Sequence, residues 1–211
     1  MRTGPILAVC LAGAALGGCA VTSDQPLFAV DQAPKHPMRE GLWALSGPGC
    51  EVKPSPAGQA LPECAGVTMT IAGPRLKFEM IATLGGPLAA GKALTTGQPS
   101  ATDFVLADGD PAIIEMLDGK TLGYDGPAPP TARQVPVSYM ALRPLEQDPQ
   151  GRIVRGVIWP ISCPDNPDGA PGFKPSPAPA STACRAETPE AVRTQAPHLK
   201  PFTSFFVTWV R

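Results

Sequence analysis

The sequence predicts an all-β fold, an antiparallel small barrel or sandwich with one short helix near the C-terminus. Two observations support this prediction. Short runs of alternating apolar and polar residues recur along the chain, and Gly, Pro and Asp-Gly turn signals separate them. With 28 proline and 22 glycine residues among 211, long helices are disfavoured, while the chain is long enough for one domain with a real core.

The expected strands follow one another along most of the chain. In residues 67–80, Val67, Met69 and Ile71 alternate with threonines, and Gly73-Pro74 marks a turn. The remaining strand signals are a strand at 41–47, a three-strand meander at 103–126 with turns at 108–111 and 118–119, a hairpin at 135–163 turning at 148–151, and a last strand within 201–211.

Between the last two strand regions the sequence changes character. Residues 163–184 are rich in proline and are expected to form a loop without regular structure. Thr188 followed by Pro189 is typical of the start of a helix, because threonine caps free N–H groups and proline fits the first turn. A short helix is therefore expected just before the last strand.

The amino terminus reads as a secretory signal peptide over residues 1–18. Arg2 supplies the positive charge, an apolar stretch runs from Ile6 to Leu16, and small residues follow. A permanent membrane span is disfavoured, because the strongly apolar part is about half the ~20 residues that a span needs.

The four residues Leu16-Gly17-Gly18-Cys19 resemble the lipobox of bacterial lipoproteins. The resemblance implies that the Cys19 thiol carries a diacylglyceryl group, and that cleavage before Cys19 frees an amine that is then acylated. Ala20 and Val21 stand where an aspartate would retain such a protein in the inner membrane, which favours the outer membrane. Residues 19–38 are then expected to be a lipid anchor and tether, and 39–211 a single β-rich domain.

Four cysteines remain once Cys10 leaves with the leader and Cys19 carries lipid. They are Cys50, Cys64, Cys163 and Cys184. An even number in an oxidising compartment suggests two disulfides, for which three pairings exist, and the pairs 50–64 and 163–184 are favoured because each encloses one Pro-rich loop. A structural metal is not expected, since no closely spaced ligand pair is present.

Several chemistries are disfavoured, and no cofactor is expected. A net charge of −1 without a basic patch argues against nucleic-acid binding. Residues 86–93 nearly match a phosphate-binding loop, but Ala93 replaces the hydroxyl residue that would hold Mg²⁺. The acidic residues Asp103, Asp108, Asp110, Glu115, Asp118 and Asp125 invite a Ca²⁺ interpretation, but a turn and strand-end role is favoured.

Catalysis is not expected, because the usual acid–base residue is scarce. The only histidines are His36, in the expected tether, and His198. A hydrolase would have to use His198 with one of Ser138, Ser162 or Ser204, and no motif chooses among these serines. The aromatic residues Trp159, Phe202, Phe205, Phe206 and Trp209 are interpreted as core and not as the lining of a ligand cavity.

Together these observations predict a non-catalytic lipoprotein of the bacterial outer membrane that faces the periplasm. Its partners would be membrane lipid, through Cys19, and an envelope protein, cell-wall material or an apolar ligand. The body of the chain resembles uncharacterised bacterial envelope proteins, which implies no activity. An alternative starts from residues 41–64, where Trp43-Ala44-Leu45 and an early cysteine pair resemble small β-barrel metalloprotease inhibitors.

Overall fold

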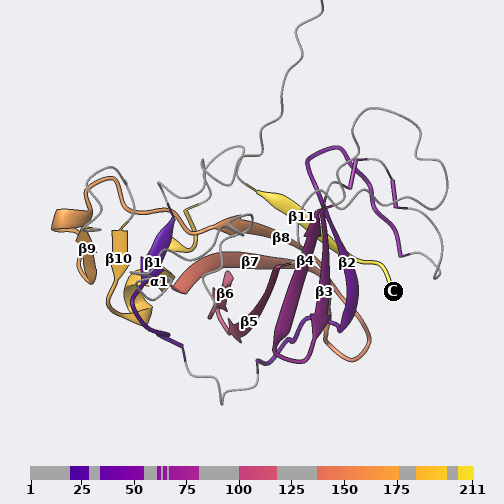
Figure 1. Cartoon of the computed structure of the whole chain (residues 1–211), viewed down its shortest axis with the longest axis horizontal. Coiled ribbons are helices and arrows are strands. Elements are labelled where there is room, and N and C mark those ends of the chain that lie inside the picture. Colours follow the sequence, from indigo (N-terminus) through magenta and orange to yellow (C-terminus); the bar gives the residue numbers. More distant parts are fainter. Residues whose placement is uncertain are drawn as a thin grey trace, which may run out of the picture.

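The computed structural model describes residues 20–28, 34–54, 61–62, 64–65, 67–80, 100–117, 137–175, 184–198 and 204–211. In these residues the fold is a closed, eight-stranded antiparallel barrel (Figure 1), which confirms the all-β prediction and selects the barrel over the sandwich. The barrel strands are β2 (Gly41–Ser46), β3 (Val67–Ala72), β4 (Arg75–Met80), β5 (Ser100–Ala107), β6 (Ala112–Met116), β7 (Val137–Gln147), β8 (Ile153–Pro160) and β11 (Phe205–Trp209).

Each barrel strand pairs with the neighbours that closure requires. Going round the barrel the order is β6-β5-β4-β3-β2-β11-β8-β7, and pairing of β6 with β7 closes the ring. The predicted turns join the strands at 73–74, 108–111 and 148–152, and Gly73 and Gly151 adopt positive φ angles of 56° and 76°. The second expected turn of the meander, at 118–119, lies outside the described residues.

Alternation along the strands fills the barrel interior. Directly paired residues such as Trp43 and Met69, or Val207 and Leu45, point to the same side of the sheet. The resulting core contains Trp43 and Val207 at 0% exposure. It comprises mainly Trp43, Met69, Ile71, Leu76, Phe104, Leu106, Ala112, Ile114, Leu142, Ile158 and Val207.

A second core lies outside the barrel. Here β1 (Val21–Ser23), β10 (Cys184–Ala186) and β9 (Phe173–Pro175) extend the sheet from β7, and α1 (Pro189–Gln195) packs beside them, to the left of the barrel in Figure 1. The helix begins as predicted, with the Thr188 hydroxyl accepting from the N–H of Ala191 at 3.2 Å. Trp159 points into this second core and donates to the Ala196 carbonyl at 2.9 Å.

The expectation of a tether over residues 19–38 is wrong at both ends of the segment, because Met38 is also buried and bridges to Ile153. Val21 is fully buried, and β1 lies between β7 and β10, pairing Thr22 with Ser138 and Val21 with Cys184. A three-residue strand carries too little alternation to be recognised in the sequence, and its partners are far away along the chain. The fold therefore already includes residues 20–23 and Met38, and not only residues 39–211.

The expectation that residues 163–184 lack regular structure is also wrong in part. A short 3-10 helix, η1 (Pro167–Gly169), is followed by β9, and β9 pairs with β10 through Lys174 and Arg185. Proline is tolerated here because β9 stands at the edge of the sheet, where one side needs no pairing.

Both expected disulfides are present. Cys50 is bonded to Cys64 and Cys163 to Cys184, each with a Cα–Cα distance of 5.7 Å, inside the usual range. The first closes the connection between β2 and β3. The second joins the end of β8 to β10, so that β1 is paired with a strand that is itself covalently fixed to the barrel.

Replacing both Cys163 and Cys184 by alanine is expected to cost about 3 kcal/mol of unfolding free energy, because the loop of separation 21 is no longer closed in the unfolded chain. Urea denaturation would measure this loss. Removing the pair Cys50 and Cys64 should cost a similar amount, but only the first change should speed amide exchange in β1 and β10. Equal amide-exchange protection of β1 in both variants would show that the Cys163–Cys184 disulfide does not hold β1 and β10 in place.

Candidate functional site

The two ends of the barrel differ in how their strands are connected. At one end, here called the turn end, the tight turns 73–74, 108–111 and 148–152 join the strands. At the other end, here called the mouth, the strands are joined by the connections 47–66, 81–99 and 117–136. Connections longer than about 12–15 residues are uncommon in compact domains and often carry function, so the mouth is the candidate binding end.

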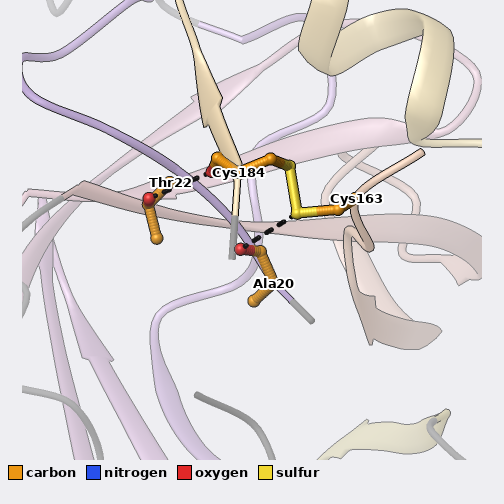
Figure 2. The surroundings of a disulfide bond; sticks show 4 residues. All are labelled: Ala20, Thr22, Cys163 and Cys184. Atoms are coloured by element: carbon orange, nitrogen blue, oxygen red, sulfur yellow. Dashed lines mark hydrogen bonds between the residues drawn. A yellow bond between two sulfur atoms is a disulfide. The ribbon is translucent and has the colours of Figure 1, made fainter. Parts of the chain in front are cut away.

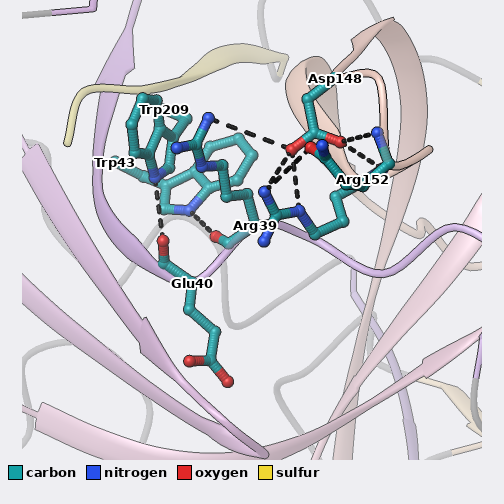
Figure 3. A network of polar contacts seen from close by, with 7 residues as sticks. Arg39, Glu40, Trp43, Asp148, Arg152 and Trp209 are labelled. Carbon is teal, nitrogen blue, oxygen red and sulfur yellow. Dashed lines mark hydrogen bonds and ion pairs between the residues drawn. The ribbon is translucent and has the colours of Figure 1, made fainter.

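A network of aromatic and charged side chains closes the turn end (Figure 3). The Arg39 guanidinium lies 3.5 Å from the ring centroid of Trp209 and 4.0 Å from an Asp148 carboxylate oxygen. The indole N–H of Trp43 donates to the Arg39 carbonyl at 2.8 Å, and that of Trp209 donates to the Glu40 carbonyl at 2.9 Å. These contacts tie the chain before β2 across the barrel end.

Asp148 is the acceptor at the centre of this network. Its carboxylate accepts from the backbone N–H groups of Gln150 and Arg152 and forms an ion pair with the Arg152 guanidinium at 2.7 Å. Burial acts to raise the pKa of Asp148, but the bonds from Arg152 and Gln150 outweigh it and hold that pKa below its usual value. The ionised Asp148 side chain therefore holds the turn between β7 and β8 in place at the turn end.

The mouth is the less tightly filled end of the interior. Deep in the barrel, Trp43, Leu142 and Val207 show no exposed surface. Several apolar side chains nearer the mouth are only partly buried: Leu45, Val67, Met116, Met140 and Phe205. Mouths of β-barrels are common places for ligands, and these five side chains offer apolar contact.

The charges of the barrel strands are concentrated away from the mouth. Ion pairs such as Arg75 with Asp103, at 3.1 Å, and Arg155 with Glu146, at 2.8 Å, lie toward the turn end. Among the two residues of each barrel strand that lie nearest the mouth, only Glu79 and the fully buried Glu115 are acidic or basic. The strand residues at the two ends thus differ in charge, although the connection 47–66 at the mouth carries the exposed ion pair of Lys53 and Glu51.

Glu115 sits in the second core and fastens the segment that follows β1. Its Oε1 accepts from the backbone N–H of Leu27 at 2.6 Å and from the Tyr139 hydroxyl at 3.1 Å. The N–H of Phe28 lies 3.4 Å from both carboxylate oxygens, and the Tyr139 hydroxyl lies 2.5 Å from Ser23 Oγ. Residues from β1, β6 and β7 are joined through this carboxylate.

Burial raises the pKa of Glu115 above its ordinary value of 4.5, although the bonds from Leu27, Tyr139 and Phe28 act in the opposite direction. Burial likewise raises the pKa of Tyr139. A raised pKa in the folded state means that the folded protein holds the proton more tightly than the unfolded chain. The stability contributed in this way is complete below the unfolded-state pKa and is lost as pH rises through the folded-state pKa.

The urea midpoint of the wild type is therefore expected to fall as pH rises above 4.5. In the variant Glu115→Gln the midpoint should fall less over the same pH range, because an amide does not titrate. Denaturation curves of both proteins across the same pH series would check this. An identical slope in the two proteins would show that Glu115 does not contribute the effect.

A shallow cleft of about 260 Å³ lies beside β1 and the β9–β10 pair. It is lined partly by charged side chains, but these are paired with one another: Arg185 with Asp24 at 2.6 Å, and Lys174 with Glu187. No described charge is left in this cleft to attract a ligand.

The structure does not assemble the hydrolase alternative. His198 is exposed just after α1, and within the described residues no hydrogen bond joins its ring to Ser138, Ser162 or Ser204. Ser162 instead faces Ala20 in an isolated β-bridge. His36 contacts the Gly151 carbonyl at 3.3 Å in the turn end.

The other candidate residues are also accounted for where they are described. Asp108 accepts from the N–H of Lys35 at 3.0 Å, and Asp103 pairs with Arg75. No group of three or more His, Cys, Asp or Glu side chains in the described part of the chain could hold a metal ion. Residues 86–93, Asp118, Asp125 and Phe202 lie outside the described residues, as does Cys19.

The mouth and the Glu115 cluster were both missed in the sequence. Strand alternation shows which residues face inward, but not which inward residues stand near an open end. No helix of the described residues is long and apolar enough to cross a membrane. No protein-family model matches the chain, and neither a curated protein nor a solved structure matches it.

Proposed function

We propose that this protein is a non-catalytic lipoprotein of the outer membrane, facing the periplasm, that uses the mouth of its barrel as a binding end. The observation that carries the proposal is that the residues directly after the lipobox cysteine belong to the folded body. Ala20, the residue directly after the lipobox cysteine, already takes part in a β-bridge, and Val21 is fully buried. A cut before Cys19 would thus release a chain whose folded part starts at once.

The cysteines support the same location, a lipid-anchored protein in the periplasm. All four cysteines among the described residues form disulfides, which leaves Cys19 as the one cysteine of the expected mature chain that is available for lipid. Disulfides persist in oxidising compartments such as the periplasm. Ala20 and Val21, in place of an aspartate, favour the outer membrane over the inner one.

Binding is favoured over catalysis by the character of the mouth. Met116, Met140 and Phe205 there are apolar and partly exposed, and no described hydrogen bond joins Ser138, at the same end, to a histidine. Long connections at one end of a rigid barrel are a common arrangement for recognition.

In-cell cross-linking tests this proposal. A photoreactive side chain at Leu45, in the mouth, should capture a specific neighbour, either a lipid or a protein, whereas one at Leu145, which is 47% exposed near the turn end, should capture only abundant bystanders. Separating the two membranes before the analysis would show which membrane holds the protein. The same bystanders at both positions would refute the mouth as the binding end, and recovery with the inner membrane would refute the address.

A second candidate is a periplasmic protease inhibitor. It is favoured by one observation, the place of Trp43-Ala44-Leu45 and the Cys50–Cys64 disulfide at the opening of a closed barrel, as the resemblance to small β-barrel metalloprotease inhibitors implies. Adding the folded protein to a panel of metalloproteases tests it. Stoichiometric inhibition of one of them would support the candidate, and full activity of all of them would count against it.

A further inference from the structure

The amino-terminal end of the fold lies at the mouth of the barrel. β1 pairs with the first residues of β7, which begin at the mouth, through Thr22 and Ser138. Ala20 bridges to Ser162, two residues beyond the end of β8, and β8 also ends at the mouth. A group attached to the residue before Ala20 would therefore emerge beside the mouth and away from the turn end.

Ala20, the residue next to the proposed attachment point, lies close against the Cys163–Cys184 disulfide (Figure 2). The Ala20 carbonyl oxygen lies 3.8 Å from the sulfur of Cys163, and the Thr22 hydroxyl donates to the Cys184 carbonyl at 3.2 Å. The disulfide between these two cysteines fixes β10 to the end of β8. Because one residue step spans only about 3.8 Å, a lipid on Cys19 would hold this edge of the domain at the bilayer surface.

The apolar strand side chains described at that end suit a lipid interface. Leu45, Val67, Met116, Met140 and Phe205 are partly exposed there, while the ion pairs of the barrel strands lie toward the turn end. Apolar side chains can enter the boundary between headgroups and acyl chains, and each one buried adds to the attraction. A charged end would resist the same contact because its charges would have to lose water.

We infer that the mouth of the barrel rests on the bilayer to which Cys19 is anchored, and that its apolar side chains contact the lipids of that bilayer. This inference rests on the proposed lipid anchor. The turn end, with its closed network around Asp148, then faces the periplasm. In this orientation membrane lipid itself occupies the binding end.

Tryptophan quenching by brominated lipid tests the orientation. The mature, full-length protein is reconstituted through its own anchor into phosphatidylethanolamine and phosphatidylglycerol vesicles, with or without bromine on the acyl chains. Phe205→Trp places a reporter in the mouth, and Leu145→Trp is the matched reporter near the turn end. The three native tryptophans are common to both variants, so the wild type supplies the background.

The mouth reporter should lose emission in brominated vesicles, and the turn-end reporter should match the wild-type background. Bromine sits only on vesicle lipids, so acyl chains of the anchor itself do not contribute. A lipidated protein in which neither reporter is quenched, or both equally, overturns the inference but leaves the anchor standing. If mass spectrometry finds no lipid on Cys19, the proposed function and this inference both fall. Capture of a protein by the Leu45 cross-linker, without quenching at Phe205→Trp, would assign the mouth to a protein partner instead.

Discussion

Cys19→Ala, expressed behind an ordinary cleavable secretory leader, is expected to appear in the soluble periplasmic fraction, whereas the wild-type protein is recovered with the outer membrane. The physical reason is the loss of the acyl chains. Each buried CH₂ contributes about 0.8 kcal/mol to membrane association, and stable anchoring takes two chains or comparable signals. Within the described residues the protein offers no helix that could replace them. Membrane fractionation and immunodetection measure the result.

Cys10→Ala is the matched control, because it removes a cysteine from the expected leader and leaves the proposed lipobox unchanged. This variant should remain with the outer membrane. The soluble Cys19→Ala protein should keep the wild-type urea midpoint, since neither disulfide involves Cys19. Equal membrane recovery of Cys19→Ala and wild type would refute the anchor.

Trp43→Ala is expected to cause the largest loss of stability among single substitutions in the barrel core, about 3–5 kcal/mol. The Trp43 side chain has no exposed surface, and it packs in the core where β2 pairs with β3 and β11. Its indole N–H also satisfies the Arg39 carbonyl, next to the network that closes the turn end. Urea denaturation of the soluble protein, with disulfides intact, would measure the change.

Two variants separate the sources of this loss. Trp43→Phe keeps much of the volume but leaves the Arg39 carbonyl without its donor, so it should cost roughly 1–3 kcal/mol. Leu145→Ala should change stability by less than about 0.5 kcal/mol, because the Leu145 side chain is 47% exposed. A similar loss for Trp43→Ala and Leu145→Ala would contradict the packed interior.

The barrel strands could be predicted because their signals are local. Alternation at Val67, Met69 and Ile71, and turn residues such as Gly73 and Gly151, act between neighbours in the chain. The strand β1 could not be predicted for the opposite reason. Its hydrogen bonds go to β7 and β10, more than a hundred residues away, and three residues carry no periodicity.

The candidate binding end could be recognised only in the folded barrel, and not in the sequence. The lengths of the connections are visible in the sequence, but their gathering at one end depends on the up-and-down order of the strands. Glu115 illustrates the same limit. In the sequence it belongs to a cluster of acidic residues at turns, yet in the fold it is fully buried and accepts from Leu27 and Tyr139.

The pairing of the cysteines links the sequence argument to the fold. Removing Cys10 and Cys19 from the count left four cysteines, and the fold pairs Cys50 with Cys64 and Cys163 with Cys184, as expected. The second disulfide also fixes the region where the chain enters the barrel edge at Ala20. The proposed anchor therefore adjoins a part of the fold that the second disulfide holds in place.

The intact mass of the mature protein tests the central proposal most directly. We predict a chain that begins at Cys19 and carries a diacylglyceryl group and an amide-linked acyl chain, with the other four cysteines oxidised in two disulfides. Peptide mapping would place the lipid on Cys19. A chain that retains Met1, or one that begins at another residue and carries no lipid, would contradict the proposal.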